Sequence, residues 1–177
     1  MASVGAAASR RVVTLFLLGA GLLFAVATAM VAAGLVSNRL PFGDPPGFLP
    51  RLQIYLTRNV AETGPDPWFP ELAPLALRGE AAALLEAIAA ACRSLGWKAV
   101  RIDPSTRRVT AEIHSSLFGF RDDLEVILME PREDVVEARV RSASRIGRGD
   151  LGANSRHVMD LRDRLRAAGL VREAPPA

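Results

Sequence analysis

The sequence predicts an α+β protein: an N-terminal transmembrane helix is followed by a two-layer sandwich with a four-stranded antiparallel sheet. Three features of the sequence predict this class. A long uncharged segment stands near the N-terminus, two later segments carry apolar residues at helical spacing, and four short alternating segments lie between these two. Each helix and the sheet has one apolar side, so we expect both helices on one face of the sheet, in the order α-β-β-β-β-α.

The predicted membrane helix covers residues 12–36, which contain no charged side chain. A helix of this length spans about 37 Å, enough to cross a hydrocarbon core of about 30 Å. Arg10 and Arg11 precede it and Arg39 follows it, which favours a cytoplasmic tail at residues 1–11 and a domain outside the cytoplasm. A cleaved signal peptide is the alternative, because small residues near its end would suit a signal peptidase.

Small residues recur on one side of this helix at every fourth position: Gly21, Ala25, Ala29 and Ala33. Such a face lets two helix backbones approach closely, so a helix-mediated homodimer is one hypothesis. Chance spacing in an alanine-rich segment is the other.

Residues 37–67 are predicted to be a proline-rich linker, because prolines at this density interrupt regular structure. Within it, Leu49, Leu52, Tyr55 and Leu56 are spaced for one short amphipathic turn. The following residues are too apolar for a linker, and we expect them to cover part of the core. A membrane-surface contact by Trp68 and Phe69 is the alternative.

The α+β domain is expected at residues 68–169. Its first helix, residues 79–95, has a single apolar face and ends at Gly96. Strands are expected at residues 97–103, 108–114, 124–129 and 135–141, joined as two hairpins. The last helix, residues 151–168, buries Leu151, Val158, Leu161 and Leu165, and residues 170–177 form a disordered tail.

A glycine-containing loop between the last strand and the last helix carries the candidate site. Asp150 is placed to accept amide hydrogens at the helix start, and Asn154 falls on the buried side of the helix. In the structural interpretation, Arg145, Asp150 and Asn154 hold the joint together by hydrogen bonds. In the functional interpretation, Arg145, Arg148 and Arg156 surround a helix N-terminus and bind an anion there.

The acid–base candidates are His114, Asp122, Asp123 and His157. No glycine-flanked serine, His-Glu-x-x-His pair or phosphate loop accompanies them. The single cysteine, Cys92, cannot form an intrachain disulfide or a multi-cysteine metal site. We therefore expect no metal and no cofactor. Arginines 10, 11 and 39 account for the net charge of +3, so the basic pI does not indicate nucleic-acid binding.

Two motifs, SSLFGFRDD at residues 115–123 and VRSASRIGRGDLGAN at residues 140–154, resemble the DUF1499 family in the same order. The resemblance covers about residues 68–165. It implies a protein from bacteria or photosynthetic eukaryotes, often behind a membrane or lipoprotein signal, and no established activity. The residues that match the motif positions are Phe118, Asp122, Asp123, Ser144, Arg145, Gly147, Asp150, Leu151, Gly152 and Asn154. Members often carry Asn-Cys-Val-Ser upstream, whereas this chain has Asn59-Val60-Ala61, without the cysteine.

The expected function is that of a single-pass module of the bacterial inner membrane, which binds a ligand rather than transforming it. Another envelope protein, a lipid headgroup or a small anion are the expected partners. The alternative is a hydrolase-like enzyme that uses His114 with Asp122 or Asp123 near Arg145.

Overall fold

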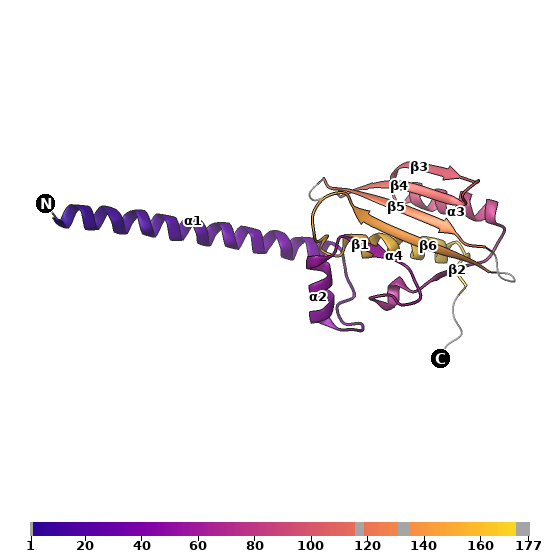
Figure 1. The fold of residues 1–177 in the computed structure, drawn as a ribbon, viewed down its shortest axis with the longest axis horizontal. Helices are drawn as coiled ribbons and strands as arrows, with labels where there is room; N and C mark the ends of the chain where they lie inside the picture. The colour runs from indigo at the N-terminus through magenta and orange to yellow at the C-terminus, as the bar shows by residue number, and fades with distance from the viewer. Residues whose placement is uncertain (1, 116–118, 131–134, 173–177) are drawn as a thin grey trace. The chain divides into compact units, whose positions relative to one another are not determined.

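The computed structural model describes all residues except 1, 116–118, 131–134 and 173–177. The chain divides into two units, Met1–Ser37 and Asn38–Ala177. Figure 1 labels its helices and strands. The elements are α1 (Ala2–Ser37), α2 (Phe48–Thr57), β1 (Val60–Glu62), η1 (Pro70–Leu72), β2 (Leu75–Leu77), α3 (Ala81–Ser94), β3 (Lys98–Asp103), β4 (Arg108–His114), β5 (Arg121–Leu128), β6 (Val136–Ser144) and α4 (Ala153–Ala167).

The first unit is the single helix α1. Its segment Arg11–Ser37 contains an 18-residue window with a mean hydropathy of 2.4, and is long and apolar enough to cross a membrane. The hydroxyl group of Thr28 donates to the carbonyl of Phe24 within the helix, so this polar side chain needs no partner outside it. The predicted N-terminal apolar helix is therefore present as a candidate membrane span.

The second unit is built on an antiparallel sheet with the order β1-β6-β5-β4-β3, in which β2 also pairs with β6. The α+β class is confirmed, but the prediction of four strands was wrong, because the sheet has six. β1 and β2 pair with opposite ends of the same edge of β6. Each has only three residues, too few for an alternating pattern to stand out in a proline-rich segment.

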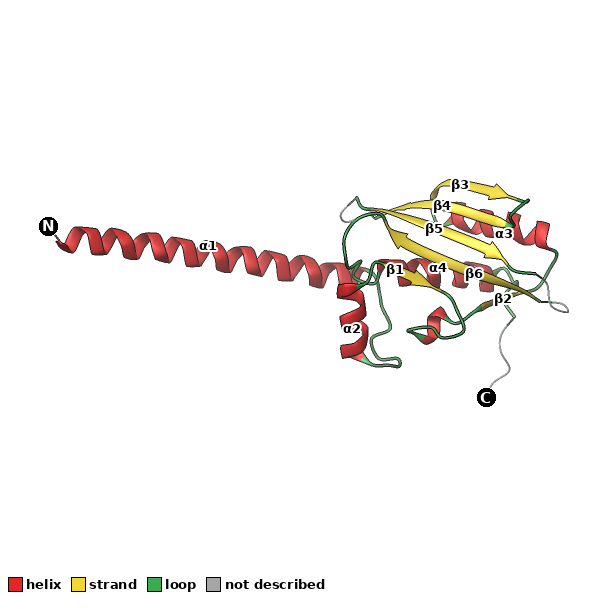
Figure 2. Ribbon diagram, viewed as in Figure 1, coloured by secondary structure: helices red, strands yellow, loops and turns green. Residues whose placement is uncertain are grey.

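Helices α3 and α4 pack on the same face of this sheet, as Figure 2 shows. The strands alternate between this covered face and an exposed one: Val109, Ala111 and Ile113 of β4 are buried, while His114 is exposed. Leu84 and Ile88 of α3 and Leu161 and Leu165 of α4 complete the core. The expected two-layer packing is present, and it leaves the other face of the sheet charged and open.

The segment predicted as a linker carries α2 and β1 within the compact unit. The expected amphipathic turn is helix α2. It buries Tyr55, a member of the predicted set, together with Arg51, which the spacing did not indicate. The Arg51 guanidinium donates to both carboxylate oxygens of Glu71, at 2.6 and 3.0 Å, and to the Tyr55 hydroxyl at 3.0 Å. It also lies 4.4 Å from the centre of the Phe69 ring. A buried ion pair thus fixes α2 to the segment that follows β1.

The residues after the predicted linker cover the core as expected: Phe69, Leu72 and Leu75 are each at most 2 % exposed. Trp68 is the exception, at 45 % exposed. At the C-terminus, Val171 pairs with Leu77, and the amide of Arg172 donates to the carbonyl of Ala76. The first part of the predicted disordered tail is therefore paired with β2, and residues 173–177 lie outside the described part of the chain.

Candidate functional site

The joint between β6 and α4 is organised around the buried Asn154. Its amide nitrogen lies within hydrogen-bond distance of the Asn59 carbonyl, the Ser144 hydroxyl and the Asp150 carboxylate, at 2.9, 2.9 and 2.6 Å. Its carbonyl oxygen accepts from the Ser142 hydroxyl at 2.6 Å. Asn154 therefore connects the residue before β1, strand β6 and the loop that precedes its own helix, as the structural interpretation predicts for Asp150 and Asn154.

Asp150 lies in the loop before α4 and caps the N-terminus of this helix. Its carboxylate accepts from the amide of Gly152 at 2.7 Å and from the amide of Asn154 at 3.0 Å. Burial raises the pKa of this carboxyl group, and the hydrogen bonds from Gly152 and Asn154 partly oppose that shift. The loop also fits closely against α2, because a Cβ at Gly149 would collide with the Leu56 carbonyl. The space between the loop and α2 is therefore filled by atoms of the protein itself.

Ser142, His157 and Asp122 meet beneath α4 and have the residue types of a catalytic triad. The Nδ1 atom of His157 lies 3.2 Å from the Ser142 hydroxyl oxygen and 3.8 Å from Asp122 Oδ2. A triad needs the serine and the carboxylate on different ring nitrogens, whereas here both face Nδ1. Ser142 is fully buried and already donates its proton to Asn154. These three residues are therefore a packed polar cluster.

This cluster makes stability depend on pH. Burial lowers the pKa of His157 below its ordinary 6.5, although Asp122 and Asp160 oppose the shift. In this pH range the unfolded chain binds a proton at His157 that the folded chain does not bind. The free energy of unfolding therefore decreases as the pH falls through 6.5 toward the pKa of His157 in the folded state. We expect chemical-denaturation midpoints to fall between pH 7.5 and 5.5 in the wild type, with a smaller decrease in His157→Gln. Arg164→Gln, at an exposed position of the same helix, is the matched control and should keep the wild-type slope; an unchanged slope in His157→Gln would contradict the assignment.

Arg145 lies on the opposite, exposed face of the sheet. It donates to both carboxylate oxygens of Asp123, at 2.9 and 2.6 Å, and to Glu112 at 2.6 Å. Glu112 also contacts Nε2 of His114. The hydrogen bonds from Arg145 lower the pKa of Asp123. The pKa of Glu112 is also lowered, mainly by the hydrogen bond with His114 and to a smaller extent by the one from Arg145. These side chains neutralise one another in an exposed ion-pair network.

The remaining predicted site residues do not converge on one place. Asp122 and Asp123 are neighbours in β5, and therefore point to opposite faces of the sheet: Asp122 is buried and Asp123 exposed. Arg156 pairs with Asp160 and Asp163 on its own helix. Arg148 is exposed, and Phe118 lies outside the described residues. An anion at the joint would have to displace these internal bonds, and anion binding there stays a prediction.

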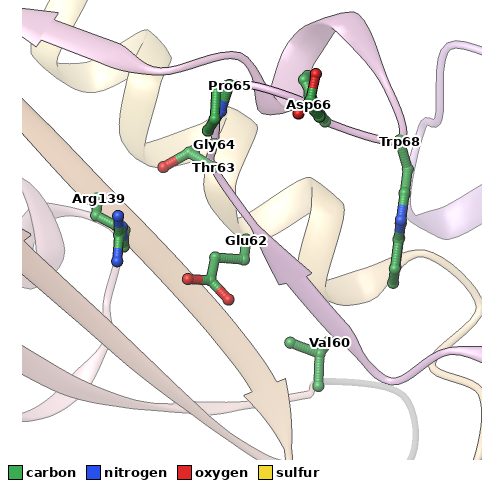
Figure 3. A pocket seen from close by; sticks show the side chains of 9 residues that line it. Val60, Glu62, Thr63, Gly64, Pro65, Asp66, Trp68 and Arg139 are labelled. Carbon is green, nitrogen blue, oxygen red and sulfur yellow. The ribbon is translucent and has the colours of Figure 1, made fainter.

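A pocket of about 440 Å³ lies at the β1 end of the sheet, and the sequence did not indicate it. Figure 3 shows its side chains around β1, with Arg139 on the side of β6 and Trp68 on the opposite side. Its lining residues are Val60, Glu62, Thr63, Gly64, Pro65, Asp66, Pro67, Trp68 and Arg139. The Arg58 guanidinium lies 5.1 Å from the centre of the Trp68 ring and steadies this indole at the pocket edge.

Three charged side chains of the pocket stand without an intramolecular partner. Among the described residues, Glu62, Asp66 and Arg139 make no hydrogen bond or ion pair through their side chains. Glu62 and Asp66 come from β1 and the loop that follows it, whereas Arg139 comes from β6, more than seventy residues later, so spacing alone could not group the three. The exposed Trp68 was the one available signal.

Metal and thiol chemistry find no support in the described part of the chain. It contains no group of three or more His, Cys, Asp or Glu side chains that could hold a metal ion. Cys92 is buried, and burial raises the pKa of its thiol to about 12, so it is present as the unreactive thiol form.

No curated protein matches the chain. A family model described as "Protein of unknown function (DUF1499)" matches residues 42–165, a range that contains α2, the whole sheet, the polar joint and most of α4. The match covers well over half of the sequence and includes both motifs that carried the resemblance. The chain belongs to the DUF1499 family.

Proposed function

We propose that the protein is a single-pass module anchored by α1, with its α+β domain outside the cytoplasm, and that it binds a ligand without transforming it. The length and apolar character of Arg11–Ser37 support the anchor. The excess of arginine before this helix supports the orientation. The family description gives no activity, and the features that support binding are those of the pocket.

The observation that carries the proposal is the set of unpartnered charges at the β1 pocket. Two other charged groups are held within the chain: Arg145 by Asp123 and Glu112, and Arg51 by Glu71. In the pocket, Glu62, Asp66 and Arg139 have no such partner and line a hollow together with the exposed indole of Trp68. Groups that converge on a hollow without partners in the chain are available to a ligand.

The mixture of charges favours a zwitterionic ligand of headgroup size. A small anion would meet Arg139 but would be repelled by Glu62 and Asp66. A ligand with an amine and an anionic group can pair with both kinds of side chain, while its apolar part contacts Trp68. A lipid headgroup has this composition, and phosphoethanolamine is its simplest soluble form.

Catalysis is the less well supported role. Asp122 is buried on the face of the sheet opposite Asp123 and Arg145, so the acid–base set proposed from the sequence is divided by the sheet. His114 is engaged by Glu112. A general base needs hydrogen-bond reach to a reacting group, and no described histidine lines the pocket.

The test measures thermal unfolding of the full chain in detergent with phosphoethanolamine as the probe. At ten times the dissociation constant, binding should stabilise the protein by about 1.4 kcal/mol, which is a rise of a few degrees in the midpoint. Arg139→Gln and Glu62→Gln should each lose most of this shift. Glu137→Gln, an exposed carboxylate on the same strand, is the matched control and should keep it.

Two results would overturn the proposal. One is an equal shift in the pocket variants and the control, which would place the probe elsewhere. The other is release of the full chain from native membranes by alkaline carbonate, which would remove the anchor.

A further inference from the structure

Several large apolar side chains of helix α2 are exposed on the surface of the domain. Phe48, Leu49 and Leu56 are 54, 73 and 43 % exposed, while Arg51 and Tyr55 are fully buried. A surface helix of a soluble domain is expected to bury its apolar side chains and to expose its charged ones. The exposed apolar face of α2, formed by Phe48, Leu49 and Leu56, therefore needs an explanation.

This orientation is held by specific contacts. Besides Glu71 and Tyr55, the Arg51 guanidinium donates to the carbonyls of Asp44 and Pro45. The Phe42 ring packs edge-on against Tyr55 at 5.6 Å between ring centres. Rolling α2 over to bury its leucines would strand a buried charge, which costs several kcal/mol. The apolar face is thus fixed outward by the fold.

We propose that α2 lies in the surface of the membrane that holds α1, with Phe48, Leu49 and Leu56 at the boundary between headgroups and acyl chains. This inference rests on the proposed anchoring. Only residues 38–47 separate α1 from α2, and ten extended residues reach at most about 36 Å. The membrane surface is therefore within reach of α2.

The charges within α2 and at the residue directly after it agree with this occupant. The helix contains no acidic residue, and the exposed Arg58 follows it directly. Apolar side chains bordered by arginine are typical of helices that lie on anionic bilayers. A second copy of the chain fits less well, because a stable dimer buries about 800 Å² on each partner, more than three partly exposed side chains supply.

The test places a fluorophore on the apolar face in the full chain. Leu49→Cys and Leu56→Cys are each labelled with the polarity-sensitive dye NBD, and Glu86→Cys on the exposed side of α3 is the matched control. The buried Cys92, whose pKa is raised to about 12, should stay unlabelled. The proteins are reconstituted in vesicles of phosphatidylcholine and phosphatidylglycerol that contain nitroxide-labelled lipid.

We expect nitroxide quenching at positions 49 and 56 to be at least twice that at position 86, with blue-shifted emission. Quenching equal to that of the control would overturn the inference. Labels that are shielded from aqueous iodide but not quenched by the lipid would also overturn it, in favour of a second copy on this face. Carbonate extraction of the same vesicles separates the two proposals. If the chain stays in the vesicles but its labels are not quenched, only the position of α2 is wrong. If carbonate releases the chain from the vesicles, the anchor and the position of α2 are both wrong.

Discussion

Replacing Arg51 by alanine is expected to destabilise the domain by about 3–5 kcal/mol, the cost of breaking a buried ion pair from one side. The side chain is fully buried and makes hydrogen bonds to Glu71, Tyr55 and the carbonyls of Asp44 and Pro45. All four groups would lose their donor, and the Glu71 carboxylate, whose side chain is 12 % exposed, would lose its counter-ion. Urea unfolding of the full chain in detergent, followed by tryptophan fluorescence, measures this loss.

The comparison variants separate the charge from the packing. Arg51→Met combined with Glu71→Gln removes both charges and keeps most of the volume, so it should be less destabilised than Arg51→Ala. Arg93→Ala, at an exposed position in the last turn of α3, should stay within about 0.5 kcal/mol of the wild type. A loss below about 1 kcal/mol for Arg51→Ala would show that this ion pair does not hold α2 in place.

Arg51 also shows why the sequence alone did not predict the orientation of α2. The spacing of Leu49, Leu52, Tyr55 and Leu56 predicts an amphipathic turn, and α2 is there, with Tyr55 as the fully buried member of this set. Its orientation is set by Glu71, twenty residues further along the chain, and local periodicity carries no information about such a contact. The three-residue strands β1 and β2 were missed for the same reason, because pairing with β6 defines them and their own pattern does not.

The elements that the sequence did predict all carry a local signal. The apolar segment of α1, the single stripes of α3 and α4 and the alternation in β4 each follow from side-chain periodicity. Asn154 was identified because it interrupts an apolar stripe. The pairing of Asp122 and Asp123 as one catalytic set was misleading, since adjacent residues of a strand face opposite ways. The pocket needed three-dimensional information, because Glu62 and Arg139 come from different strands.

Replacing Asn154 by alanine is expected to destabilise the domain by about 2–4 kcal/mol. Its amide group is fully buried and faces the Asp150 carboxylate, the Ser144 hydroxyl and the Asn59 carbonyl, while its oxygen accepts from Ser142. A buried partner that loses its hydrogen bond costs about 1–3 kcal/mol, and more when it is charged. Water entering the new space would recover part of this cost.

Asn154→Asp provides the sharper comparison, because it keeps the size and replaces the donor by a second carboxyl group beside Asp150. Burial already raises the pKa of Asp150, and a neighbouring carboxylate would raise it further. The folded variant would then bind protons that the unfolded chain releases, so its loss of stability relative to the wild type should shrink as pH falls from 7 to 5. Arg164→Ala, exposed on the same helix, should change little. If Asn154→Ala unfolded like the wild type but failed to bind phosphoethanolamine, Asn154 would belong to the ligand site instead.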